Sequence, residues 1–135
     1  MLRTQELFDS VTTASPLGNE VLARAVGALA DCEQAVTACA AGMLAEKDAD
    51  ELRTAICQDL DCADVVAATR RVLTRGSSHD PAQLTAQVEA CRIACGRSHD
   101  LCAQHARHHE HCRICAETTA EAAAVCRDVL AAVRS

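Results

Sequence analysis

Hydrophobic and polar positions repeat with a helical period in four long segments of the chain. In the first of them, from about Asn19 to Glu46, leucines and valines recur at spacings of three, four and seven residues. This spacing places apolar side chains on one face and is typical of an amphipathic helix. The alternation of β-branched or aromatic residues with polar ones that would predict a strand is missing. The pattern therefore predicts an all-α protein.

Residues that begin or end helices separate the segments. The sequence KDAD at 47–50 marks the first junction, and Asp50 is the predicted N-cap of the second long helix. The clearest break runs from Gly76 to Pro81, where a glycine follows a helix end and a proline takes the first position of the next helix. The junction around Arg107 holds neither Gly nor Pro, which leaves one continuous helix as the alternative there.

Four helices of similar length joined by short turns predict an antiparallel up-down-up-down four-helix bundle. The expected bounds are 19–46, 50–75, 81–105 and 108–133. A short helix over residues 3–13 is expected to precede them and to end at the turn of Ser15 and Pro16. We therefore divide the chain into a short N-terminal helix within residues 1–14 and a bundle domain with a cysteine-lined core over residues 17–135.

Composition excludes several classes of function. The 135 residues include ten cysteines and a single aromatic side chain, and the net charge is −6, which argues against binding to nucleic acid. No run of about 18 apolar residues predicts a membrane span, and the N-terminus has no apolar signal-peptide core. We expect a cytoplasmic protein, where thiols stay reduced, so the cysteines favour metal binding over disulfides.

The cysteines follow the helical period. Nine of them lie on the inward faces of the four helices: Cys32, Cys39, Cys62, Cys91, Cys95, Cys102, Cys112, Cys115 and Cys126. Cys57 lies about 140° around its helix from Cys62 and does not fit, whereas Asp59 does. Buried free cysteines can act as small hydrophobic residues. Stripes on all four helices instead favour a thiol-lined interior.

Helix rise places these thiols in tiers along the bundle axis. Cys102, Cys112 and Cys115 are expected within roughly 10 Å of the end that carries the first and third junctions. A second tier, with Cys32, Cys62, Cys91 and Cys95, is expected at about 18 to 25 Å. Three histidines gather at the near end, with Met43 close by: His105, His109 and His111.

The pattern discriminates between metals. It matches neither an iron–sulfur run nor the C-x-x-C-H of haem attachment, because Ala116 follows Cys115. Cu(I) is soft and is selected by thiolates, and it accepts two or three sulfurs, so several ions fit along such a tube. Inward thiols on packed helices leave no substrate cleft, so we expect no enzyme activity.

Two alternatives stay open. His108, Cys112 and Cys115 form an H-x3-C-x2-C pattern similar to that of zinc-binding anti-sigma factors, which indicates a zinc-bound regulatory module. A thiol redox sensor is the other, since a helix N-terminus near Cys112 would favour its thiolate.

The chain resembles the bacterial copper storage proteins of the cytosolic type. The resemblance lies in LDCADVV (60–66), CRIACGRSHDLC (91–102) and HARHHEHCRICAE (105–117). It implies a tetramer of four-helix bundles that stores many Cu(I) ions. A copper chaperone or an acceptor protein is the expected partner. The resemblance also implies that the nine inward cysteines are core ligands and that His105, His109 and His111 are entrance ligands, with Asp61 assisting early binding. We keep Cys57 in the predicted ligand set despite its position.

The chain departs from that family at stripe positions where such proteins often carry further cysteines. These positions hold Val36, Met43, Val66, Ser98, Thr119 and Ala122 here. The departures predict a reduced member with a smaller capacity and separated clusters of ions.

Overall fold

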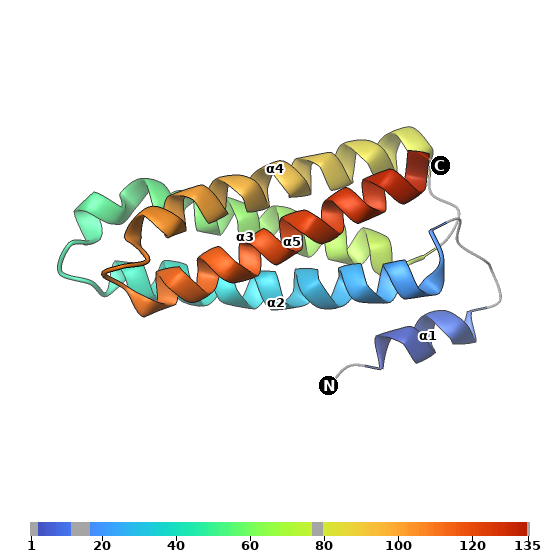
Figure 1. Ribbon diagram of the computed structural model, residues 1–135, viewed down its shortest axis with the longest axis horizontal. Coiled ribbons are helices and arrows are strands. Elements are labelled where there is room, and N and C mark those ends of the chain that lie inside the picture. Colours follow the sequence, from blue (N-terminus) through green and yellow to red (C-terminus); the bar gives the residue numbers. More distant parts are fainter. Residues whose placement is uncertain (1–2, 12–16, 77–79, 135) are drawn as a thin grey trace.

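Four long helices run antiparallel to one another in the computed structural model, and a short helix lies beside one end (Figure 1). The structure describes residues 3–11, 17–76 and 80–134. The helices are α1 (Thr4–Ser10), α2 (Asn19–Leu44), α3 (Arg53–Thr74), α4 (Pro81–His105) and α5 (Glu110–Arg134), with a 3₁₀ helix η1 (Ala49–Leu52) between α2 and α3. The predicted all-α up-down-up-down bundle with a preceding short helix is confirmed. The division into two parts at residues 14 and 17 stays a prediction.

The helix boundaries follow local chemistry in most places. The carboxylate of Asp80 accepts a hydrogen bond from the backbone N–H of Gln83 at 3.0 Å, with Pro81 in the first turn of α4. Gly76 has a φ of 74°, the left-handed conformation that ends a helix at low cost for glycine. The alternative of one continuous helix around Arg107 is wrong, because α4 ends at His105 and α5 begins at Glu110.

The predicted N-cap at Asp50 is also wrong. Asp50 lies inside η1, and its carboxylate pairs with the exposed guanidinium of Arg53 at 3.3 Å instead of accepting a backbone N–H. Leu52 is the residue before α3, and it offers no side-chain cap. The 3₁₀ turn satisfies this junction through backbone bonds such as that from the N–H of Glu51 to the carbonyl of Asp48. The short helix predicted over residues 3–13 ends earlier, at Ser10, and the Ser15-Pro16 turn lies outside the described residues.

The core changes character along the bundle axis. At the end where α2 begins and α5 finishes, aliphatic side chains fill the interior: Leu22, Leu29, Leu73, Leu84, Val88, Val129 and Leu130. Phe8 of α1 is buried at this end, and a Cβ on Gly76 would lie 3.3 Å from its ring. Figure 1 shows that the opposite end carries η1 and the junction of α4 and α5. Toward this end, buried thiols enter the core beside Met43 and Leu52. We call this opposite end the mouth.

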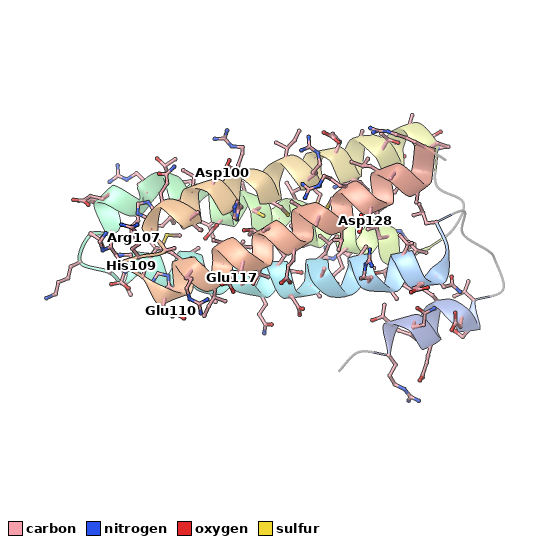
Figure 2. The ribbon with its side chains drawn as sticks, viewed as in Figure 1. Asp100, Arg107, His109, Glu110, Glu117 and Asp128 are labelled. Atoms are coloured by element: carbon pink, nitrogen blue, oxygen red, sulfur yellow. The ribbon has the colours of Figure 1, made fainter. Side chains whose placement is uncertain are left out.

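Charged side chains occupy the outer surface of the bundle. Asp100, Glu117 and Asp128 are exposed and lie on the outside of α4 and α5, while His109 and Arg107 lie at the mouth (Figure 2). None of the helices in the described part of the chain is long and apolar enough to cross a membrane.

Candidate metal centre

The interior is lined by thiols, as the helical period predicts. Nine of the ten cysteines are buried, and Cys57 is exposed on α3. The six stripe positions without cysteine are fully buried as well: Val36, Met43, Val66, Ser98, Thr119 and Ala122. The inward orientation of both sets is therefore confirmed.

The group nearest the mouth combines two thiols with an imidazole, and we call it the mouth group. His111 Nδ1 lies 3.5 Å from the Sγ of Cys39 and 3.6 Å from that of Cys112, and the two sulfurs are 3.8 Å apart. Gly42 of α2 makes room for this ring, because a Cβ there would approach it to 3.1 Å. Three potential ligand atoms thus converge between α2 and α5.

Carboxylates hold the histidines at the mouth. Glu46 Oε1 lies 3.0 Å from His111 Nε2 and 3.3 Å from His109 Nδ1, and Asp48 Oδ2 lies 3.2 Å from His109 Nε2. The two rings stack with their centroids 5.4 Å apart. These contacts orient both imidazoles, and the hydrogen bond at Nε2 leaves Nδ1 of His111 facing the thiols.

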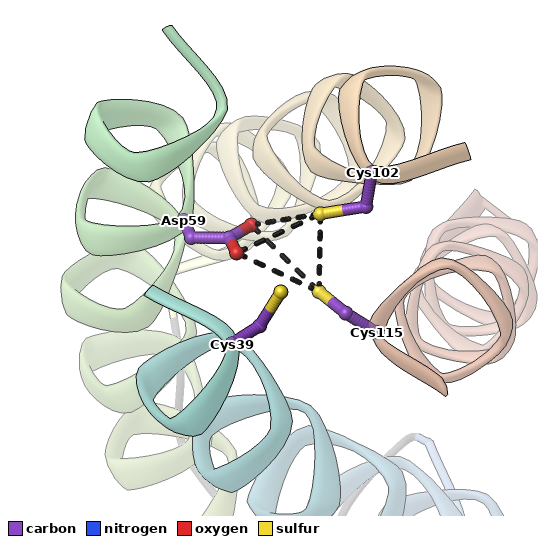
Figure 3. A group of neighbouring side chains, drawn as sticks. All are labelled: Cys39, Asp59, Cys102 and Cys115. Carbon is purple, nitrogen blue, oxygen red and sulfur yellow. Dashed lines mark hydrogen bonds between the residues drawn. The ribbon is translucent and has the colours of Figure 1, made fainter. Parts of the chain in front are cut away.

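The next group toward the interior contains one side chain from each long helix, and we call it the carboxylate–thiol group. Figure 3 shows its members, Cys39, Asp59, Cys102 and Cys115, converging between the four helices. The thiols of Cys102 and Cys115 are 3.4 Å apart, and each donates toward the Asp59 carboxylate at 3.5 to 3.7 Å. Burial raises the pKa of Asp59 to about 6.

A deeper group consists of thiols alone. The Sγ of Cys95 lies 4.0 Å from that of Cys32 and 3.9 Å from that of Cys62, and the three ligand atoms fall within 4.8 Å of one another. Hydrogen bonds from Cys32 and Cys95 lower the pKa of the Cys62 thiol, whereas the pKa of Cys95 is raised by its bonds with Cys32 and Cys62. Cys91 and Cys126 extend the line of thiols further from the mouth. A hydrogen bond with Cys126 lowers the pKa of Cys91. We call Cys32, Cys62 and Cys95 the deep group.

Several predicted ligands lie outside these groups. Among the described residues, the structure does not bring Cys57, His105 or His108 into a cluster of converging ligand atoms. His105 is half-buried, and His108 and Cys57 are exposed. Asp61, expected to assist early binding, is also exposed on the outer face of α3.

The arrangement does not favour the two alternative readings of Cys112. Cys112 and Cys115 belong to different groups, and exposed His108 joins neither, so the H-x3-C-x2-C pattern does not converge on one ion. Burial raises the pKa of Cys112, whereas a redox sensor needs an accessible thiol with a lowered pKa.

Sequence reasoning assigned no role to three carboxylates at the site. It placed Asp59 on the inward helical stripe of Cys62 but did not count it as a ligand, because acidic residues seldom face a core. Glu46 and Asp48 belong to the first junction, and nothing in their spacing indicated contact with histidines more than sixty residues away. Only the antiparallel packing of α2 against α5 brings them together.

Replacing His111 with alanine is expected to slow metal uptake and to leave the final number of bound ions nearly unchanged. The imidazole faces two thiols at the mouth, but most of the thiols lie beyond it. Stopped-flow absorbance of the copper–thiolate band in the reduced protein measures the rate, with a decrease of roughly tenfold expected. His108→Ala, on an exposed histidine of the same junction, is the matched control, and equal rates for both variants would contradict the role of His111.

The bundle has successive thiol groups along its interior and histidines at its mouth. It therefore belongs to the class of thiol-lined metal-binding bundles. Comparison with known proteins gives the family. The family model described as copper storage protein matches residues 18–131, and the chain belongs to this family.

Solved structures of similar proteins support the same assignment. The copper storage protein Ccsp from Streptomyces lividans, loaded with 10 copper equivalents, is 37% identical with a TM-score of 0.90, and the match covers 95% of this chain and 98% of that one. A cytosolic copper storage protein from the same organism with five coppers is 41% identical with a TM-score of 0.81, over 83% of this chain and 93% of that one. A search of curated proteins found no match.

Proposed function

We propose that this protein stores several Cu(I) ions as thiolate complexes inside its bundle and has no catalytic activity. The observation that carries the proposal is the set of nine buried cysteines, which all four long helices contribute. Sulfur atoms 3.4 to 4.0 Å apart are close enough for neighbouring thiolates to share ions. Thiolate ligands select Cu(I) over harder ions, and burial keeps the bound copper away from water and oxidants.

The distribution of thiols predicts loading in stages. Copper enters past His109 and His111, binds the mouth group and then passes to the thiols beyond it. Each thiol that becomes a ligand gives up its proton, so apparent affinity falls as the pH is lowered. The buried aliphatic and hydroxyl side chains on the stripes reduce the capacity and separate the ions. The aliphatic end of the core closes the bundle opposite the mouth.

Membership of the family supports a proposal for the assembly and the location of the protein. We propose a cytoplasmic homotetramer that receives copper from, or delivers it to, a small copper chaperone. A relative with 41% identity is described as cytosolic, which supports the location. Exposed hydrophobic side chains on α3, α4 and α5, namely Leu60, Ile93 and Ile114, are available for contacts between copies.

Anaerobic titration of the reduced protein with Cu(I), in competition with a strong chelator and followed by native mass spectrometry, tests the storage function. Several ions per chain are expected, with the absorbance of copper–thiolate bonds rising in parallel. Cys57→Ala is expected to match the wild type, because this thiol is exposed and outside the groups. Fewer than about two ions per chain would overturn the proposal.

A further inference from the structure

Asp59 is an unusual residue for the centre of a bundle. Its side chain is fully buried, and no Lys, Arg or His in the described part of the chain pairs with it. Its carboxylate instead accepts hydrogen bonds from two thiols, and the side chain has no solvent-accessible surface. A buried carboxylate without a cationic partner costs free energy unless a metal ion compensates its charge.

The distances around Asp59 match the edges of a coordination tetrahedron. A zinc ion with bonds of about 2.3 Å to sulfur and about 2.0 Å to oxygen places two sulfurs about 3.8 Å apart and a sulfur and an oxygen about 3.5 Å apart. The observed sulfur pair is at 3.4 Å, and the sulfur–oxygen pairs are at 3.5 to 3.7 Å. The fourth ligand atom, the Sγ of Cys39, lies within 4.8 Å of the others. Cys102, Cys115 and Asp59 therefore already lie near tetrahedral distances from one another, and the sulfur of Cys39 closes the set by moving toward them.

We propose that the carboxylate–thiol group binds one tetrahedral divalent cation of the zinc class. Three thiolates and a carboxylate form a closed four-coordinate set, which suits Zn²⁺ and its spectroscopic substitute Co²⁺. Cu(I) is satisfied by two or three sulfurs and gains less from the oxygen. The deep group has no oxygen ligand at all, so the two groups differ in the metals that they favour.

Such an ion would connect the whole bundle. Its ligands come from α2, α3, α4 and α5, one from each, so a single divalent cation bridges all four long helices (Figure 3). Zinc thereby stabilises the copper-free protein, and incoming Cu(I) displaces it by taking the three thiolates that the two metals share. The inference shares these cysteines with the storage function but does not depend on it.

Cobalt titration of the reduced, metal-free protein under anaerobic conditions tests the site. One equivalent of Co²⁺ is expected to give the visible ligand-field bands of a tetrahedral complex and the near-ultraviolet charge-transfer band of cobalt–thiolate bonds. One equivalent of Zn²⁺ then abolishes both. Cobalt held by Glu46, His109 and His111 at the mouth would lack the sulfur charge-transfer band. Ligand-field bands without this charge-transfer band would therefore overturn the proposal.

Variants locate the ion. Asp59→Asn is expected to weaken cobalt and zinc binding by about tenfold or more, whereas Asp61→Asn, an exposed aspartate on the same helix, leaves it unchanged. Cys102→Ala is expected to remove the tetrahedral spectrum, and Cys95→Ala in the deep group to retain it. Equal effects of the two aspartate variants, or loss of the spectrum in Cys95→Ala alone, would overturn the assignment. Copper stoichiometry measured on the same samples judges the storage function separately.

Discussion

Loading with Cu(I) is expected to raise the free energy of unfolding by about 4 kcal/mol for each independent site, when free Cu(I) exceeds its dissociation constant a thousandfold. The gain arises because the folded bundle holds converging thiols, whereas the unfolded chain offers only scattered ones. Thermal unfolding followed by circular dichroism, in anaerobic solution with increasing copper, measures the effect. We expect the midpoint temperature to rise in steps as successive groups fill.

A variant of the deep group tests most directly whether copper binding causes this gain in stability. A triple variant combines Cys32→Ala, Cys62→Ala and Cys95→Ala. It removes all three sulfurs of the deep group, which lie within 4.8 Å of one another. The variant is expected to bind fewer Cu(I) ions and to gain less stability from copper than the wild type. Its metal-free stability is measured in parallel, because the three truncations also leave small cavities. If copper stabilised this variant and Cys57→Ala equally, the deep group would hold no copper.

Replacing Asp59 with asparagine is expected to stabilise the metal-free protein at neutral pH by about 3 kcal/mol. Burial raises the pKa of this carboxyl from its ordinary 3.8 to about 6, so the folded protein holds the proton more tightly than the unfolded chain. Below about pH 4 both states are protonated and the group has no effect on stability. Between pH 4 and pH 6 the unfolded chain alone ionises, and stability falls as the pH rises. Above pH 6 the carboxyl is ionised in both states, and the full loss of stability caused by its burial is present.

Urea denaturation of both proteins between pH 4 and pH 8, in the presence of a chelator, measures this dependence. The advantage of Asp59→Asn over the wild type is expected to vanish near pH 4 and to reach its maximum above pH 6. Asp61→Asn controls for the loss of one negative charge from α3. If the free energy of unfolding changed with pH in the same way for the wild type and Asp59→Asn, the Asp59 carboxyl would not be desolvated.

The two Asp59 experiments are linked. The same carboxylate that lowers the stability of the metal-free bundle is the oxygen ligand that we propose for a divalent cation. Adding one equivalent of Zn²⁺ at pH 7 should therefore narrow the difference in stability, since the wild type gains a ligand that Asp59→Asn has lost. A tenfold difference in zinc affinity offsets about 1.4 kcal/mol of the advantage of Asp59→Asn, because the metal binds the folded state alone.

The sequence by itself determined the helices and the faces that they bury. Helical spacing placed nine cysteines inward and left Cys57 outside, because the period of 3.6 residues is a local property that requires no knowledge of partners. It identified the break at Pro81 for the same reason, since capping acts within one turn. The 3₁₀ turn at Asp50 was missed, because backbone bonds there replaced the side-chain cap that the residue type indicated.

Only the tertiary structure decided how the thiols are grouped and what joins them. Which sulfur faces which depends on the rotation and axial offset of packed helices, and these are set by the whole core. Cys39 of α2 meets both Cys112 and the carboxylate–thiol group, Glu46 meets two histidines of a distant segment, and Asp59 meets thiols of α4 and α5. Spacing along a helix gives the face of a residue, but partners on other helices follow from packing alone.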